Sequence, residues 1–138
     1  MVKSQLGQVY RRNSVATATP LGLVIMLYDG MIANLARAER SLAAGENEEC
    51  ARRLGRAQDI ICELMGSLDF ERGGEIARNL FRVYEYMNYR LIQANLRRDP
   101  AIAAEVRGLA IQLKEAWEEA ERRLGTSRRE GAALDLGV

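Results

Sequence analysis

Apolar residues recur every three or four positions through four stretches of the chain, and short polar segments separate these stretches. This spacing places the apolar residues on one face of a helix. The apolar face of the first predicted helix comprises Leu23, Leu27, Met31, Leu35, Ala38 and Leu42. This helix is predicted to start at Thr19-Pro20, because threonine caps free N–H groups and proline suits the first helical position. Gly45 is its predicted end.

The second and third predicted helices are separated by a glycine-containing turn, Asp69 to Gly74. The second starts at Asn47, where two carboxylates follow at the positive end of the helix dipole. The third runs from about Glu75 to Leu96. Their apolar faces are Cys50, Leu54, Ala57, Ile61, Leu64 and Leu68 in the second, and Ile76, Leu80, Val83, Met87, Leu91 and Ala94 in the third. The third helix also carries Phe81, Tyr84, Tyr86 and Tyr89 elsewhere on its circumference, which is more apolar area than one bundle seam needs.

A fourth helix is predicted to start at Asp99-Pro100, which repeats the combination of cap and proline. Its apolar face is Ile102, Val106, Leu109, Leu113, Ala116, Ala120 and Leu124, with Trp117 beside it. No segment shows sustained strand alternation. Four helices joined by short loops predict an all-α, antiparallel up-down-up-down four-helix bundle over residues 19–124. We expect residues 1–18 to form a mobile N-terminal arm and residues 125–138 a disordered tail.

Composition and charge exclude several classes of protein. The 138 residues fit one domain. The 20 basic and 19 acidic residues alternate along the segments, which argues against a nucleic-acid partner. The N-terminal region lacks a long apolar stretch, and no run approaches the roughly 20 apolar residues that span a bilayer. We therefore expect a cytoplasmic protein without membrane insertion. Cys50 and Cys62 would lie about 18 Å apart on one helix, too far for a disulfide, and are expected to be reduced and buried.

Residues for catalysis are scarce. The chain has no histidine, no CxxC pair, no ExxH pair and no glycine-rich phosphate loop. Asp29 and Glu85 lie beside tyrosines or apolar residues, but such carboxylates usually find an arginine or a backbone donor. We predict no cofactor, no metal and no enzymatic activity. The tyrosine-rich third helix either forms a groove for a partner helix or completes a core edge with its hydroxyls in water, and periodicity alone does not decide.

Two longer stretches resemble a known family. The first is YRRNSVATATP at residues 10–20, which continues to MLYDG at residues 26–30. The second is NLFRVYEYMNYRLIQAN at residues 79–95. Shorter matches are AQDII at residues 57–61, Glu63-Leu64, Leu68-Asp69, and Trp117 with Ala120. In order and spacing over about residues 5–124, the chain is similar to the flagellar export chaperone family FliS, the flagellin-specific secretion chaperones.

The resemblance implies an antiparallel four-helix bundle that binds the C-terminal segment of flagellin in the cytosol. One chaperone would hold one flagellin segment as an elongated, partly helical chain wrapped around the bundle. It would prevent premature polymerisation and aid delivery to the flagellar export apparatus. An apolar groove of this kind also allows a weak homodimer. The alternative is a helical adaptor for another secretion or regulatory protein.

The family's motifs also suggest which residues bind the partner. The predicted partner-binding set is taken from the residues that match these motifs and comprises Tyr10, Asn13, Thr17, Leu23, Leu27, Tyr28, Asn79, Tyr84, Tyr86, Arg90 and Asn95. We expect Tyr84, Tyr86 and Arg90 to be nearer the surface. We expect the arm around Tyr10 to lie over a groove and move when the partner binds; the alternative is that Tyr10 pins it permanently. A further hypothesis is that the apolar stretch ALDLGV docks into the same groove.

Overall fold

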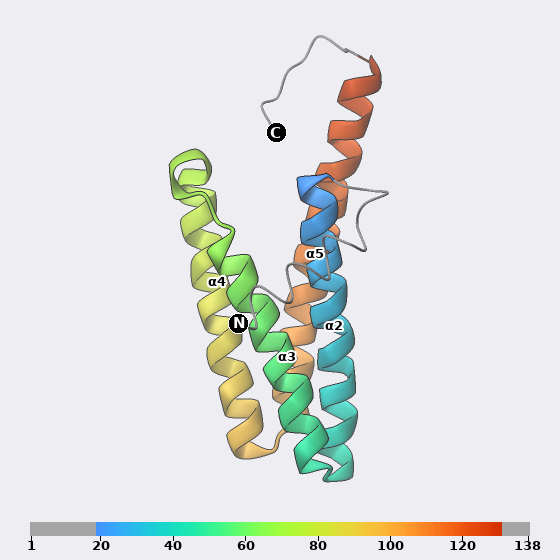
Figure 1. Cartoon of the computed structure of the whole chain (residues 1–138), viewed down its shortest axis with the longest axis vertical. Coiled ribbons are helices and arrows are strands. Elements are labelled where there is room, and N and C mark those ends of the chain that lie inside the picture. Colours follow the sequence, from blue (N-terminus) through green and yellow to red (C-terminus); the bar gives the residue numbers. More distant parts are fainter. Residues whose placement is uncertain (1–18, 131–138) are drawn as a thin grey trace.

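The computed structural model describes residues 19–130, with side chains for residues 19–125, and every element in that range is a helix. The helices are α2 (Pro20–Ala44), α3 (Asn47–Gly66), α4 (Phe70–Arg97) and α5 (Pro100–Glu130). They run alternately in opposite directions and are joined by short connections (Figure 1). The predicted all-α four-helix bundle is confirmed. The predicted arm and the last eight residues of the predicted tail lie outside the described residues.

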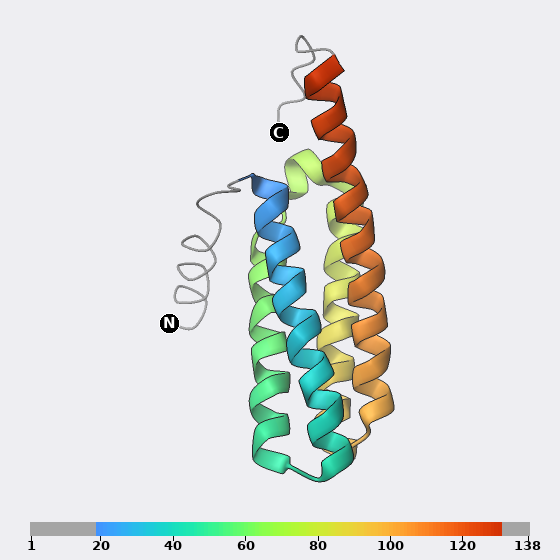
Figure 2. The ribbon, with the colours of Figure 1, turned by 90° about the vertical axis from the view of Figure 1, so that its right-hand side faces the viewer.

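The four helices are not packed equally. α2 packs closely against both α3 and α5. α4 lies at the opposite corner and contacts α3 and α5 less extensively. In Figure 1 the upper part of α4 leans away from α2 and α5, while the turned view of Figure 2 shows α2 and α5 side by side. The bundle is therefore closed around α2 and looser around the N-terminal part of α4.

Three predicted helix ends are confirmed by their caps. The Gly22 amide donates to Thr19 Oγ1 at 2.9 Å, directly before Pro20. Gly45 ends α2 in the left-handed region, with φ of 72°, which glycine adopts without steric cost. The Ala101 amide donates to Asp99 Oδ1 at 2.9 Å at the start of α5. Local chemistry therefore determines these boundaries.

The start of α4 differs from the prediction. The amides of Glu71 and Arg72 both donate to Asp69 Oδ1 at 3.1 Å, so a helical turn begins at Phe70 rather than at Glu75. Gly74 then interrupts the helix with φ of 49° and ψ of −122°. Only glycine takes such angles readily. The segment predicted as a turn is thus a capped helical turn followed by a break.

The other end of the bundle domain also differs. α5 continues to Glu130, six residues beyond the predicted end at Leu124. Gly125 is tolerated inside the helix, and the arginines and Glu130 that follow favour helix. The last part of α5 therefore projects past the other helices (Figure 1).

The core contains most of the residues that periodicity predicted. Met31, Leu35, Ala38, Ala57, Ile61, Met87, Ala94 and Val106 are fully shielded from water. Four expectations were wrong. Ala116, predicted on the apolar face of the fourth helix, is exposed. Ile76 is 70% exposed, because Ala77 takes the inward position just after the break at Gly74, whereas Tyr84 is buried in the core. Cys50 is buried as expected, but Cys62 is exposed because it points away from the α3 seam.

Candidate functional site

Large apolar side chains in contact with water are concentrated on α4. Among the residues whose side chains are described, every exposed large hydrophobic residue belongs to this helix: Phe70, Ile76, Tyr86, Tyr89, Ile92 and Leu96. Single exposed apolar residues are normal on protein surfaces, but several on one element indicate an interaction site. The outer side of α4 is therefore the first candidate surface.

Three of these residues form a continuous row, which we call the α4 stripe: Tyr89, Ile92 and Leu96. Their spacing of three and four residues places them on one helix face. They are 57%, 46% and 77% exposed, respectively. The Tyr89 hydroxyl accepts a hydrogen bond from Gln93 Nε2 at 2.9 Å, so its ring is held along the helix surface. The α4 stripe has the shape and spacing that an amphipathic helix can pack against.

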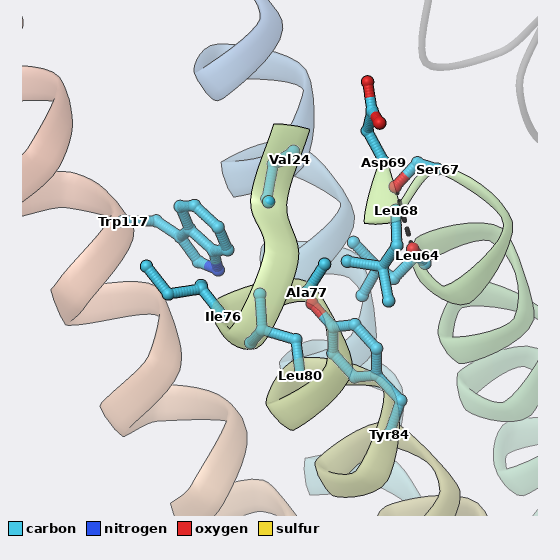
Figure 3. A pocket seen from close by; sticks show the side chains of 11 residues that line it. Val24, Leu64, Ser67, Leu68, Asp69, Ile76, Ala77, Leu80, Tyr84 and Trp117 are labelled. Carbon is cyan, nitrogen blue, oxygen red and sulfur yellow. Dashed lines mark hydrogen bonds between the residues drawn. The ribbon is translucent and has the colours of Figure 1, made fainter. Parts of the chain in front are cut away.

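A second feature, the upper pocket, lies where α4 leans away from its neighbours. It is a mainly apolar cavity of about 230 Å³. Figure 3 shows side chains from all four helices and from the α3–α4 connection around it. Its lining comprises Val24, Leu64, Ser67, Leu68, Asp69, Gly73, Ile76, Ala77, Leu80, Tyr84 and Trp117. Ile76 stands at the rim, since it both lines the cavity and is largely exposed.

Beside the upper pocket, two tyrosines join the diagonal helices. The hydroxyls of Tyr28 on α2 and Tyr84 on α4 are 2.6 Å apart, and both side chains are buried. Burial raises the pKa of Tyr28, although its hydrogen bond to Tyr84 acts in the opposite direction. Burial also raises the pKa of Tyr84, and its contact with Tyr28 adds to the rise. The pair is therefore neutral at physiological pH and joins α2 to α4 by a buried hydrogen bond.

The wall opposite this pair contains an unpaired donor. Trp117 Nε1 is buried and has no hydrogen-bond partner within the described part of the chain. It is near enough to Tyr28 to oppose the rise in the pKa of that hydroxyl, but its geometry does not make a hydrogen bond. In Figure 3 the indole nitrogen is turned toward the cavity. A buried N–H without a partner is costly, so it is a candidate contact for a bound carbonyl.

A charged network closes the other edge of α4 against α5. Glu105 on α5 accepts hydrogen bonds from the Tyr86 hydroxyl at 2.6 Å and from Arg90 Nε at 2.9 Å. These bonds lower the pKa of Glu105, the Tyr86 hydroxyl making the larger contribution. Glu105 in turn raises the pKa of Tyr86 and of Arg90 through the same hydrogen bonds. The Tyr86 hydroxyl and the Arg90 guanidinium thus already bind Glu105, which leaves fewer of their hydrogen-bonding positions for a partner.

No metal-binding cluster is found among residues 19–125. No group of three or more His, Cys, Asp or Glu side chains in the described residues is placed to hold a metal ion. Asp29 pairs with Lys114 Nζ at 2.6 Å between α2 and α5, and the bond raises the pKa of that lysine. Glu85 is exposed on α4. The two carboxylates considered for acid–base chemistry are therefore ordinary surface groups here.

The structure separates the predicted partner-binding residues into three groups. Tyr10, Asn13 and Thr17 lie outside the described residues. The buried members are Leu27, Tyr28 and Tyr84, and the expectation that Tyr84 is near the surface was wrong. Its ring faces α2 because the inward side of α4 passes through Ala77, Tyr84, Met87 and Leu91. The accessible or half-buried members are Leu23, Asn79, Tyr86, Arg90 and Asn95.

Sequence reasoning missed the α4 stripe as a unit and missed the upper pocket. The stripe could have been recognised from the sequence, because Ile92 and Leu96 continue the spacing of Tyr89 along a second apolar row of the same helix. The surplus of apolar area on this helix was the signal. The upper pocket had no such signal, since its lining comes from four helices that only the fold brings together.

One helix satisfies a simple length and hydropathy test for a membrane span. It is α2, and it supplies much of the protein core here, including Met31 and Leu35. A core helix of a soluble bundle passes the same test. The result is weak evidence for membrane insertion.

Comparison with known proteins shows the family. The sequence profile of the family described as "Flagellar protein FliS" matches residues 2–124. The chain is 42% identical over 113 residues to the flagellar secretion chaperone FliS of Salmonella typhimurium, which covers 81% of this chain and 84% of the relative. It is 37% identical over 111 residues to FliS of Bacillus subtilis, covering 80% and 82%. It is 38% identical over 114 residues to the chaperone FliSB of Pseudomonas aeruginosa, covering 83% and 90%.

These relatives are named as chaperones of flagellar secretion, which fits a helical bundle with an apolar helix face. The match extends through all of α2, α3 and α4 and most of α5. The chain therefore belongs to the FliS family of flagellar secretion chaperones.

Proposed function

We propose that this protein is a cytoplasmic export chaperone that binds the C-terminal segment of flagellin. It keeps that segment from polymerising early and brings it to the flagellar export apparatus. The observation that carries the proposal is the apolar outer face of α4 in a chain of the FliS family. Flagellin as the client comes from the resemblance of residues 10–30 and 79–95 to the family's motifs.

The surface on α4 suits a client that folds as it binds. An amphipathic client helix can cover Tyr89, Ile92 and Leu96, and a second apolar side chain can enter the upper pocket. Burial of one large aliphatic side chain stabilises a complex by about 1.5–3 kcal/mol. Several such contacts offset the entropy that a disordered segment loses on binding.

Polar groups beside the α4 stripe can fix the orientation in which the client binds. Arg90 and Tyr86 already bind Glu105, so they present a fixed, partly charged border to the α4 stripe. Asn95 has a buried Oδ1 without a hydrogen-bond partner in the described residues and lies between Leu91 and Leu96 in sequence. Asn79 is exposed on the same helix. Client amides are suitable partners for these groups.

The buried members of the predicted set act mainly through the fold in this proposal. Tyr28 and Tyr84 join α2 to α4, Leu27 packs in the core, and of the three Tyr84 also lines the upper pocket. Leu23 is half-buried on the first turn of α2, close to the end where the upper pocket opens. The arm with Tyr10, Asn13 and Thr17 joins α2 at this same end, and we propose that it moves when the client binds.

The experiment is a binding measurement with the purified full chain and the C-terminal segment of its cognate flagellin. We expect a 1:1 complex by calorimetry and by size-exclusion chromatography with light scattering. The matched control is the same flagellin without its C-terminal segment, which should not bind. Absence of a complex at micromolar concentrations would overturn the proposal and would favour a helical adaptor for another secretion or regulatory protein.

The role of the arm is tested separately. Deletion of residues 1–18 should change flagellin affinity and increase hydrogen exchange in the first turns of α2. An unchanged affinity together with unchanged exchange would exclude a moving arm. Light scattering of the chaperone alone also shows whether the α4 face supports a weak homodimer.

A further inference from the structure

The upper pocket has two unfavourable features, a buried donor without a partner and an apolar side chain in contact with water. Trp117 Nε1 is a buried donor without a partner among the described side chains and backbone. Ile76 is 70% exposed although it lines the cavity. An occupant that supplies a carbonyl oxygen and covers Ile76 would correct both.

The unpaired N–H favours an extended occupant over a helical one. In a helix the backbone carbonyls bind amides of the same helix, so they are not available to Trp117. In an extended segment every second carbonyl points to the same side and stays free. Alternate apolar side chains of such a segment also share one side, which matches a narrow apolar cavity.

The segment after α5 has this pattern. Residues 131–138 read GAALDLGV, in which Leu134, Leu136 and Val138 alternate with Asp135 and Gly137. If the segment is extended, the three apolar side chains lie on one side and Asp135 on the other. It is also outside the family match, which ends at residue 124.

We propose that residues 131–138 fold back along α5 and dock in the upper pocket as an extended strand. Leu136 and Val138 enter the apolar cavity, and a backbone carbonyl beside them accepts the hydrogen bond from Trp117 Nε1. The docked segment covers Ile76 at the rim. It occupies part of the surface assigned above to flagellin, and so it lowers the affinity for the client; only this last consequence rests on the proposed function.

The geometry allows the segment to reach. Glu130 lies thirteen residues beyond Trp117, which corresponds to about 20 Å of helix. An extended chain spans about 3.3–3.6 Å per residue, so the eight residues after Glu130 reach at most roughly 29 Å. A return along α5 to the level of Trp117 therefore uses about six residues and places Leu136 at the pocket.

Attachment to α5 makes weak docking sufficient. A short tether holds a segment near its site at an effective concentration of about the millimolar range. The apparent affinity for the client is the intrinsic affinity multiplied by the fraction of molecules in which the pocket is open. If one-third to one-tenth of the molecules are open, removal of the segment tightens client binding about threefold to tenfold.

Trp117 provides the direct test, because it is the only tryptophan in the chain. Its quenching by acrylamide is measured in the full chain, in Leu136→Ser/Val138→Ser, and in the matched control Ala132→Ser/Ala133→Ser. We expect stronger quenching and a red-shifted emission in the first variant and no change in the control. Adding a synthetic peptide of residues 131–138, at millimolar concentration, to protein truncated after Glu130 should restore the protection.

Three outcomes would overturn the proposal. In one, Leu136→Ser/Val138→Ser leaves Trp117 quenching unchanged. In the second, deletion of residues 1–18 exposes Trp117 while the serine variants do not, which identifies the arm as the occupant. In the third, quenching changes with protein concentration, which identifies a second copy of the chain.

Flagellin affinity then tests the consequence. Leu136→Ser/Val138→Ser should bind the C-terminal segment of flagellin about threefold to tenfold more tightly than the control variant. Because the fluorescence assay contains no flagellin, failure of the proposed function and failure of segment docking are distinguishable. Equal affinity with exposed Trp117 would show that the segment docks without competing with the client, and would overturn that consequence.

Discussion

α2 and α4 lie at opposite corners of the same bundle, and they use their apolar residues in different ways. α2 places Met31, Leu35 and Ala38 in the closed core and is held to α5 by ion pairs from Glu39 and Asp29. α4 places Tyr84 and Met87 in the core but leaves a second apolar row in water. The comparison indicates that α2 mainly stabilises the fold, whereas α4 combines stability with a surface that suits a partner.

The largest expected effect comes from a matched pair of leucine substitutions on the two helices. Leu35→Ala on α2 should lower the free energy of unfolding by about 2–5 kcal/mol, because it opens a cavity at a fully buried position. Leu96→Ala on α4 should change it by no more than about 0.5 kcal/mol, because that side chain is 77% exposed. Urea unfolding at neutral pH measures both. Similar losses in the two variants would contradict the division between the helices.

The second prediction concerns binding instead of stability, and here substitutions on α4 should have the larger effect. Ile92→Ser/Leu96→Ser should weaken flagellin binding by about tenfold or more, because each buried aliphatic side chain contributes about 1.5–3 kcal/mol. The fold should be unaffected, since both residues are exposed. Ala51→Ser/Cys62→Ser, two exposed positions of α3, serves as the control. Calorimetry gives the affinities, and equal affinity in both variants would remove the α4 stripe from the client site.

The third prediction concerns the bond that joins α2 to α4. Tyr84→Phe should lower the free energy of unfolding by about 1–3 kcal/mol, because the Tyr28 hydroxyl is left buried without this partner. Tyr28→Phe/Tyr84→Phe should lose less than the single change, because no hydroxyl is then stranded. Thermal and urea unfolding of the three proteins measure the difference. A larger loss in the double variant would show that the Tyr28 hydroxyl makes stabilising contacts other than the one with Tyr84.

The same pair predicts a loss of stability at alkaline pH. The pKa values of Tyr28 and Tyr84 are raised in the folded state, so the unfolded chain releases these protons first. Their contribution is complete below about pH 10, the usual tyrosine pKa, and is lost as the pH rises above it. Tyr28→Phe/Tyr84→Phe should show a shallower loss over this range. An equal slope would assign the alkaline loss to other groups, such as Tyr86.

The smallest effect is expected at the exposed edge between α4 and α5. Glu105→Gln removes the acceptor of Tyr86 and Arg90, but exposed ion pairs contribute little to stability. The loss should be a small fraction of that for Leu35→Ala. Because the pKa of Glu105 is lowered in the fold, its contribution is present above about pH 4.5 and disappears as the pH falls through the folded value. Glu115→Gln on the same helix is the control in acid unfolding.

Much of the fold was predictable because the signals are local. Thr19 with Pro20, Gly45 and Asp99 each act on the one or two helical turns beside them, and all three boundaries are found where expected. The start of α4 was harder, because Asp69 is an equally good cap for a turn that the glycines then interrupt. The choice between two nearby starts depends on how the first turn packs, and local chemistry does not contain that information.

The candidate site was only partly predictable. The sequence by itself determined the helices, their inward faces and the excess of apolar residues on α4, because these follow from spacing along one element. Only the tertiary structure decided that Tyr84 turns inward to meet Tyr28, that Ile76 stands at a rim, and that Trp117 lacks a partner. These arrangements bring together residues that are distant in sequence, such as Tyr28 and Tyr84, 56 positions apart, and packing of whole helices determines such meetings.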